Sequence, residues 1–250
     1  MTITEAHYHF KLLYNKWDSQ HKRDLNPAEI DEILNKAQDI WVEQTYSAYN
    51  SKQVGFEMTQ QRMDDLSHLV IKCPSNLQNI LSPVLTLVKG IYVFDLKDLN
   101  FDYLHYIRGV ANLRRGSDNC TTDAEILIVQ HDDINRLLKD TFKKPSFEWG
   151  RVLGTFGRAS ANAADLSSLY IYAANDFVID SICVEYIKKP DRVSIGGYND
   201  INGNLKSTVE FELPHYVVLQ IVDLAVREAQ RILLDPEGFQ MYGNLVNDNE

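Results

Sequence analysis

A cluster of glycines at residues 150–157 (GRVLGTFG) is the first group whose type and spacing could do chemistry. Glycine lets backbone N–H groups approach a phosphate closely, so glycine-rich loops often bind nucleotides. The spacing here fits neither the G-x-G-x-x-G pattern nor the P-loop, and no helix signal follows it. We therefore predict a glycine-kinked strand or a turn at this position.

Histidines and carboxylates, the usual metal ligands and acid–base groups, form no recognisable site in the sequence. His7 and His9 are two residues apart and would face different sides of a helix, and the others occur singly at His21, His68, His105, His131 and His215. The H-x-x-x-H pair of a helical zinc site is absent from the sequence. Adjacent acids at residues 64–65 and 132–133 are typical of a solvated helix face and of helix capping.

Serines occur without a G-x-S-x-G elbow, so a serine hydrolase has no support. We therefore expect no catalytic residues, no metal ligands and no cofactor, and we interpret the chain as an interaction or structural protein, not an enzyme. An enzyme with a dispersed site stays open as an alternative, because sequence spacing does not reveal such a site.

Composition sets wider limits on the class of protein. The 250 residues are 44% hydrophobic and 24% charged, which is typical of a folded globular chain. A net charge of −10 makes tight DNA binding unfavourable. The longest apolar runs, at residues 83–88 and 91–94, are shorter than the roughly 18 residues of a membrane helix, and Glu5 and His7 interrupt any signal peptide. We therefore expect neither membrane insertion nor secretion through a signal peptide. The three cysteines are widely spaced, which predicts reduced and mostly buried thiols.

Helical periodicity dominates residues 1–72, which we predict to be a helical part. Thr2 and Glu5 form a capping box ahead of an apolar stripe, which predicts a helix near residues 3–18. Asn26 and Pro27 give the strongest helix start in the sequence, and the helix that follows should reach about residue 48 and pack on the first as a hairpin. A short third helix is predicted over residues 59–69.

After Pro74 the apolar period falls to about two, which predicts a β-rich domain over residues 73–212. The expected strands lie at residues 84–96, 103–113, 124–130, 169–173, 177–188 and 207–212, with a short helix after Asp133 and a hairpin turn at Asn175 and Asp176. A long loop at residues 189–205 interrupts this domain. Loops of that length inside compact domains are usually functional.

Residues 213–250 are predicted to form a long helix, opened by Leu213 and Pro214 and ended by Asp235 and Pro236, and a tail. This helix should pack on the N-terminal helices. The predicted fold class is therefore α+β: an N-terminal helical hairpin and a long C-terminal helix packed together, with a sandwich- or barrel-like β-rich middle region.

Three stretches of the chain resemble a known family. They are TEAHY at residues 4–8 with FKL at 10–12, EI at 29–30 and NKAQ at 35–38; FEMTQQRMDDL at 56–66; and YIKKP at 186–190, followed by the Leu213-Pro214 step and the helix at 217–232. Together they resemble virion structural proteins of crAss-like short-tailed phages, the ring proteins of the neck and tail. The resemblance covers nearly the whole chain.

The resemblance implies a structural protein that forms a ring, commonly of twelve copies, as a head-to-tail connector that joins portal to tail and lines the DNA ejection channel. Its partners would be copies of itself, the portal protein and neighbouring ring or hub proteins, with double-stranded DNA only as non-specific cargo and with no membrane. The implied location is the virion, after assembly in the host cytoplasm. No catalytic residues are carried over from such a family.

The charge suits a conduit, because twelve copies at −10 each would carry about −120 (12 × −10) and repel DNA phosphates. A head-to-tail ring contact needs two different patches on each subunit. The candidate assembly residues lie on the long loop and the tail, and are Lys188, Lys189, Pro190, Arg192, Tyr198, Phe239 and Tyr242. Deletion of residues 196–204 is expected to leave the monomer folded and to block assembly.

A second class of function stays open from the residues alone. Domains rich in β-structure with aromatic loops commonly bind sugars, so the alternative is a monomeric β-rich ligand- or carbohydrate-binding module. A concave aromatic face and a monomeric state would distinguish it from a ring protein.

Overall fold

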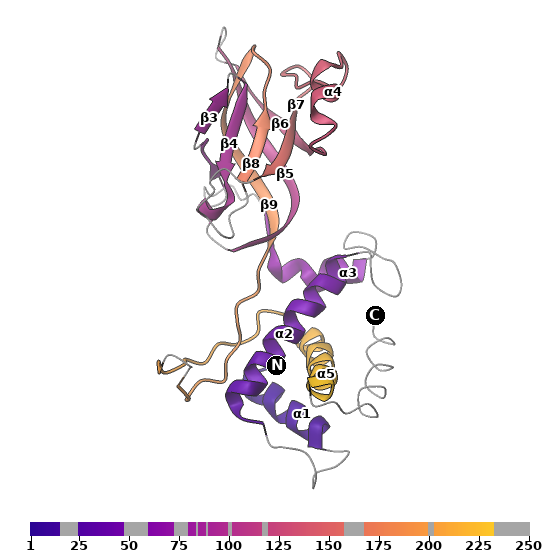
Figure 1. Cartoon of the computed structure of the whole chain (residues 1–250), viewed down its shortest axis with the longest axis vertical. Helices are drawn as coiled ribbons and strands as arrows, with labels where there is room; N and C mark the ends of the chain where they lie inside the picture. Colours follow the sequence, from indigo (N-terminus) through magenta and orange to yellow (C-terminus); the bar gives the residue numbers. More distant parts are fainter. Residues whose placement is uncertain are drawn as a thin grey trace. The chain divides into compact units, whose positions relative to one another are not determined.

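The computed structural model describes residues 1–15, 25–47, 60–72, 80–83, 85–88, 90–99, 102–116, 120–157, 168–199 and 203–232. The chain divides into two compact units. One contains residues 1–69 and 190–250 and is called the helical unit; the other contains residues 70–189 and is called the sheet unit (Figure 1). The expected α+β class, with helices towards both ends of the sequence and strands between them, is confirmed.

The helical unit is built from α1 (Ile3–Asn15), α2 (Pro27–Tyr46), α3 (Gln60–Leu66) with a 3₁₀ turn (Ser67–Leu69), and α5 (His215–Ile232). The two predicted helix starts are confirmed. The Glu5 N–H donates to Thr2 Oγ1 at 3.2 Å, and the Asn26 N–H donates to the Glu29 carboxylate at 2.9 Å. Both contacts satisfy N–H groups that have no partner within the helix.

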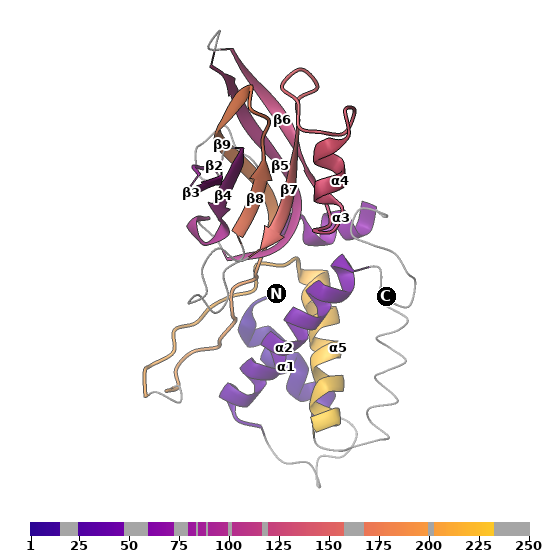
Figure 2. The ribbon, with the colours of Figure 1, turned by 45° about the horizontal axis from the view of Figure 1, so that its top comes forward.

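Helix α5 contacts both α1 and α2, and Figure 2 shows the three helices side by side. Their facing sides are apolar and buried, and they share a spacing of three and four residues that keeps each stripe on one side of its helix. The buried stripes are Ile3, Ala6 and Phe10 on α1, Ile30, Leu34, Ala37 and Trp41 on α2, and Val218, Ile221, Val222 and Ala225 on α5. The predicted packing of the C-terminal helix on the N-terminal helices is present in this core.

In the described part of the sheet unit, nine strands form one sheet. They are β1 (Val70–Ile71), β2 (Ile80–Leu81), β3 (Leu85–Val88), β4 (Ile91–Asp95), β5 (Tyr103–Arg115), β6 (Thr121–Ile128), β7 (Arg151–Gly157), β8 (Ser168–Tyr172) and β9 (Phe177–Lys188). Their order is β1-β9-β5-β6-β7-β8-β4-β3, with β2 also paired to β9. Leu96–Asp98 forms a 3₁₀ turn after β4.

The pair β6–β7 is parallel, whereas the other pairs in the sheet are antiparallel. A parallel pair needs a crossover connection, which here contains α4 (Ile134–Lys139). Figure 2 shows α4 beside β7. The predicted short helix after Asp133 and the glycine-containing strand at residues 151–157 are thus confirmed.

One apolar core packs against this curled sheet, to which all nine strands of the described residues belong. The core takes alternate residues from most strands, including Phe94, Ala111, Leu113, Ile126, Val152, Leu169, Ile171, Ile182, Val184 and Tyr186. The predicted strand at residues 84–96 is two strands, because Gly90, at φ +93°, turns the chain between them. The predicted strand at 207–212 forms only an isolated bridge, between Val209 and Ser194.

The cysteines differ from the prediction of reduced, buried thiols. Cys183 on β9 is disulfide-bonded, and Cys120 is a free, exposed thiol at the start of β6. None of the helices in the described part of the chain is long and apolar enough to cross a membrane.

Candidate assembly surface

Residues 191–199 and 203–212, together called the arm, run antiparallel to each other as two irregular segments of the helical unit (Figure 1). Ser194 and Val209 exchange both backbone hydrogen bonds, at 3.1 and 2.8 Å. Further out, the Lys206 N–H donates to the Tyr198 carbonyl at 2.9 Å, and an isolated bridge joins Asn199 to Leu205. These contacts give the arm a defined path without a regular ladder.

Two glycines shape the bend of the arm. Gly196 and Gly197 have φ of +73° and +76°, a region that other residues rarely adopt. A Cβ on Gly196 would lie 2.7 Å from the Thr208 nitrogen on the opposite side of the hairpin, whereas a Cβ on Gly197 would meet nothing within 4 Å. Gly196 is therefore required for close backbone approach as well as for its φ.

The arm is fastened to α2 by a buried stripe of polar side chains at Asp31, Asn35 and Gln38. The Asn35 side chain accepts from the Val193 N–H at 2.8 Å and donates to the Val193 carbonyl at 2.9 Å. Gln38 Nε2 donates to the Asp191 carbonyl at 3.2 Å. The helix thus satisfies the backbone of the arm where it has no strand partner.

Asp31 is the centre of this attachment. Its carboxylate contacts His7 Nε2 of α1 at 2.7 Å and accepts hydrogen bonds from the Tyr198 hydroxyl at 2.6 Å and the Ile195 N–H at 3.1 Å. Burial alone would raise the pKa of Asp31, but the hydrogen bonds from His7, Tyr198 and Ile195 outweigh it and hold the pKa below its ordinary value. One ionised carboxylate therefore joins α1, α2 and the arm.

The returning side of the arm is held at its base by two carboxylates. Glu210 accepts from the Ile3 N–H at the first turn of α1 at 2.6 Å, where a negative charge also suits the helix dipole. Glu212 accepts from the Asp191 N–H at 3.2 Å, across the base of the hairpin. Both sides of the arm are therefore anchored in the helical unit.

Polar contacts also join α5 to its neighbours. The buried Glu228 carboxylate lies 2.9 Å from Lys36 Nζ and 2.6 Å from Arg231 Nη2, and Trp41 Nε1 donates to Gln220 at 3.0 Å. The Tyr216 hydroxyl donates to Asp65 at 2.7 Å, which raises the pKa of Tyr216 to about 12. Burial raises the pKa of Asp65 despite that hydrogen bond.

The structure separates the residues predicted for assembly. Lys188 is buried at the end of β9, the Lys189 N–H donates to the Asp102 carbonyl at 2.8 Å, and Pro190 is buried. Arg192 is exposed on the arm, 3.7 Å from the exposed Glu32 carboxylate of α2. The arm thus brings Arg192 and Tyr198 together on α2, whereas Lys188 and Lys189 belong to the sheet unit. Phe239 and Tyr242 lie outside the described residues.

Sequence reasoning missed the residues that hold the arm, namely His7, Asp31, Asn35 and Gln38. A signal for three of them is present. Asp31, Asn35 and Gln38 follow one position after Ile30, Leu34 and Ala37, so they lie beside the apolar stripe and share its inward side. Polar residues at such positions need buried partners, and here the backbone of the arm supplies them.

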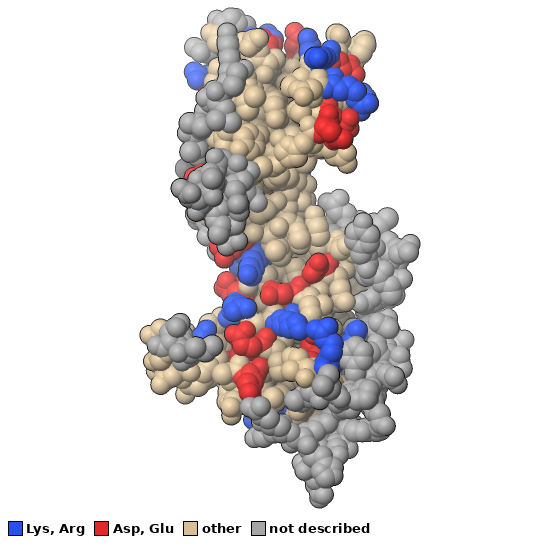
Figure 3. All heavy atoms as spheres, viewed as in Figure 1, with Lys and Arg blue, Asp and Glu red and all other residues tan. Residues whose placement is uncertain are grey.

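Charges of both signs are interspersed around α2 on the face shown in Figure 3. Within the described residues, no group of three or more His, Cys, Asp or Glu side chains is placed to hold a metal ion.

A folded unit that holds out such an arm is typical of proteins that assemble with others. The family of phage tail ring protein 3/4, from crAss-like phages, matches residues 1–232, and the chain belongs to that family. The resemblance to crAss-like phage ring proteins is thereby confirmed, and with it a structural role in the tail ring of the virion. A search of curated proteins finds no match to this sequence.

Proposed function

We propose that this chain forms a homo-oligomeric ring, of twelve copies, that joins portal to tail in the phage neck and lines the channel through which DNA is ejected. The ring has no enzymatic activity, and it assembles in the host cytoplasm from copies of the chain before it joins the portal and the neighbouring ring or hub proteins. Family membership supports the ring itself; the remaining features are supported by the arm and by the net charge.

The observation that carries this proposal is the contrast between the two ends of the arm. Its root is fixed by hydrogen bonds to buried side chains of α2, whereas Leu205 near its tip is 75% exposed. Because the arm is held in place, the exposed leucine does not bury its apolar surface within its own molecule. A second molecule that covers it would provide that burial. A projection of this kind gives one half of a head-to-tail contact, the type that closes a ring.

Net charge supports the channel. Twelve copies at −10 each give about −120 (12 × −10), so the inner wall would not retain a duplex by counterion release. A conduit needs this property, because DNA that binds to the wall does not slide past it.

Mass photometry and negative-stain electron microscopy of the purified chain test the proposal, alone and with the portal and tail proteins of the same phage. The matched variant replaces residues 199–205 by Asn-Gly. This excision disturbs the attachment of the arm less than deletion of residues 196–204, because it keeps the hydrogen bond from the Tyr198 hydroxyl to Asp31. Wild type should form closed rings, and the excision variant should keep its circular dichroism spectrum but stay monomeric.

Two results would contradict the proposal. If the excision variant formed rings at the same concentration as wild type, the arm would not be required for assembly. If the wild-type chain stayed monomeric in the presence of every virion component, the proposed ring would be contradicted and the ligand-binding alternative would be favoured. Val178→Ser provides the control, because it removes an exposed apolar side chain of β9 and should leave assembly unchanged.

A further inference from the structure

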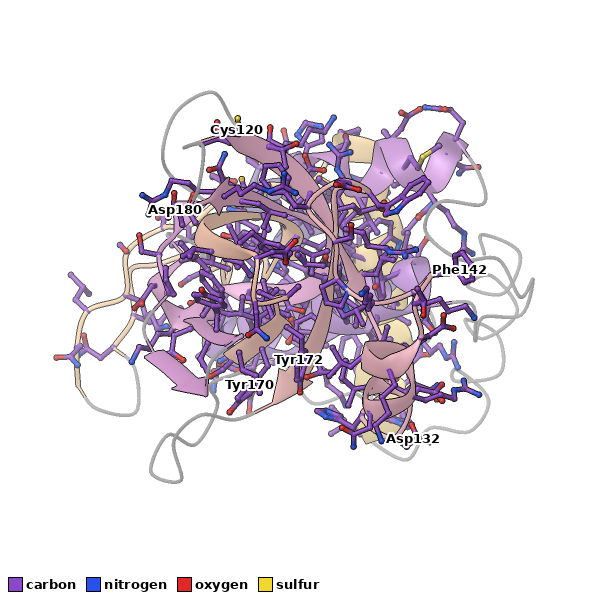
Figure 4. The ribbon with its side chains drawn as sticks, turned by 90° about the horizontal axis from the view of Figure 1, so that it is seen from above. Cys120, Asp132, Phe142, Tyr170, Tyr172 and Asp180 are labelled. Carbon is purple, nitrogen blue, oxygen red and sulfur yellow. The ribbon has the colours of Figure 1, made fainter. Side chains whose placement is uncertain are left out.

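Two large aromatic side chains of the sheet unit are almost fully exposed to solvent. Phe142 and Trp149 are 86% and 80% exposed, on the segment of residues 140–150 between α4 and β7, here called the aromatic loop. Figure 4 shows Phe142 at the periphery of the unit, apart from Cys120 and from Tyr170 and Tyr172 of β8. Large exposed apolar side chains that lie close in sequence typically mark a contact surface.

The aromatic loop is held in one conformation by its own contacts. Ser146 and Arg151 exchange both backbone hydrogen bonds, at 2.9 and 3.1 Å, and the Arg151 guanidinium donates to the Phe142 carbonyl. Phe147 points the other way, with its ring centroid 6.4 Å from that of Phe177 and 4.6 Å from the Arg115 guanidinium carbon. Because the loop is already ordered, little conformational entropy is lost when Phe142 and Trp149 are covered.

A hollow of about 650 Å³ lies against the aromatic loop. Phe142 and Trp149 line it together with Lys144, Glu148, Asn175 and Asp176. The surface therefore combines two exposed aromatic rings with a pair of exposed carboxylates and one lysine.

Leu205 and Lys206, called the arm tip, offer an apolar side chain and a positive charge that complement the rings and carboxylates at the hollow. Leu205 is 75% exposed, so that Phe142, Trp149 and Leu205 are the three most exposed large apolar side chains in the described part of the chain. Lys206 follows Leu205 and is exposed, and its charge is opposite to those of the exposed Asp176 and of Glu148, which lies 3.8 Å from the Arg115 guanidinium. Apolar and charged groups thus match in kind between the two surfaces.

We infer that the arm tip of one copy docks on the aromatic loop of the next copy, with Leu205 between Phe142 and Trp149 and Lys206 against Glu148 and Asp176. This inference rests on the proposed ring and names its contact. The two surfaces differ, so the contact is head-to-tail, and it propagates around a ring where a contact between two identical aromatic loops would stop at a dimer.

Cysteine cross-linking tests the contact directly. The chain with Thr141→Cys, Asn204→Cys and Cys120→Ser places one free thiol beside the hollow and one beside Leu205, and leaves Phe142, Trp149 and Leu205 unchanged. A short bismaleimide should give a ladder of covalent multimers. Either cysteine alone should give none, and Asn204→Cys with the native Cys120 is the control for position.

Charge reversal gives an independent readout. Lys206→Glu and Glu148→Lys should each raise the concentration needed for half-assembly about tenfold, and the two together should restore most of it. Trp149→Ser should raise that concentration by at least as much, with unchanged circular dichroism. Val178→Ser, which removes an exposed apolar side chain outside the hollow, should have no effect.

The outcomes separate this contact from the ring itself. Rings that form without a ladder and that tolerate Trp149→Ser overturn the contact and leave the ring standing. A dimer from Thr141→Cys alone overturns it in favour of a symmetric pair. Saccharides that change the Trp149 fluorescence of a chain without a ladder assign the hollow to carbohydrate instead. A chain that never assembles overturns both proposals.

Discussion

The Asn35 side chain forms the same pair of hydrogen bonds with Val193 that a neighbouring strand would form. Its amide oxygen accepts from the Val193 N–H at 2.8 Å, and its amide nitrogen donates to the Val193 carbonyl at 2.9 Å. One side chain of α2 thereby satisfies a buried segment of the arm that is not part of any sheet. The stability of the arm therefore depends on a few side chains of the helical unit.

Asn35→Ala should detach the root of the arm. It leaves the Val193 N–H and carbonyl without their partner, at a cost of about 1–3 kcal/mol for each buried group. Hydrogen exchange should show faster exchange over residues 191–199, and urea unfolding should show a lower midpoint. Asp39→Ala, which removes an exposed carboxylate elsewhere on the same helix, is the control. Equal protection of the arm in both variants would contradict this role of Asn35.

Asp31 should make the helical unit sensitive to acid. Its folded pKa lies below the ordinary value of 3.8, so its stabilising contribution is complete above that value and is lost as the pH falls through the folded pKa. Urea unfolding followed by circular dichroism at 222 nm should show this loss as the pH falls below about 4. Asp31→Asn should be less stable at pH 7 and should lack that part of the pH dependence.

Asp39→Asn is the matched control for Asp31, because Asp39 is an exposed carboxylate on the same helix. This variant should keep the wild-type profile. A profile for Asp31→Asn that is parallel to wild type down to pH 2 would show that the ionised carboxylate does not hold the arm.

Substitution of the two adjacent glycines of the arm, Gly196 and Gly197, should have different effects on the backbone pairing of the arm. Gly197→Ala should cost about 1 kcal/mol, the penalty for a side chain at positive φ. Gly196→Ala carries that penalty and also places a Cβ 2.7 Å from the Thr208 nitrogen, so it should break the pairing of residues 194–198 with 206–209. Amide exchange at Val209 and Lys206 measures the pairing. Similar exchange in the two variants would contradict the close approach.

Tyr186→Ala should be among the most damaging substitutions in the sheet unit. Tyr186 is fully buried in the core, and loss of a large aromatic side chain costs about 3–5 kcal/mol. Arg114→Ala removes an exposed two-bond contact with Asp180 on the same pair of strands, and it should leave the urea midpoint nearly unchanged. Equal midpoints for the two variants would place Tyr186 outside the core.

Periodicity predicted the elements that carry the fold, because apolar stripes are a local signal. Ala6 and Phe10 of α1 and Ile30, Leu34 and Trp41 of α2 follow the helical spacing of three and four residues, and they are buried. The long strand at β9 and the turn at residues 175–176 also follow from local residue types. The parallel pairing of β6 with β7 does not, because strand order depends on contacts distant in sequence.

The attachment of the arm was not predictable in the same way. Asn35 and Val193 are far apart in sequence, and a hydrogen bond from a side chain to a backbone group leaves no periodic pattern. The exposure of Phe142 and Trp149 was not predictable either, because in the sequence alone an exposed aromatic residue cannot be distinguished from a core residue. The disulfide at Cys183 was missed because cysteine spacing alone does not reveal pairing.

The insertion of residues 70–189 between the two segments of the helical unit has a consequence for synthesis on the ribosome. Ile30, Leu34 and Trp41 emerge early, but α5, which covers α2, emerges only after the whole sheet unit. The arm also emerges late, immediately before α5. A nascent chain therefore offers no arm to a neighbouring chain until its own sheet unit has been synthesised.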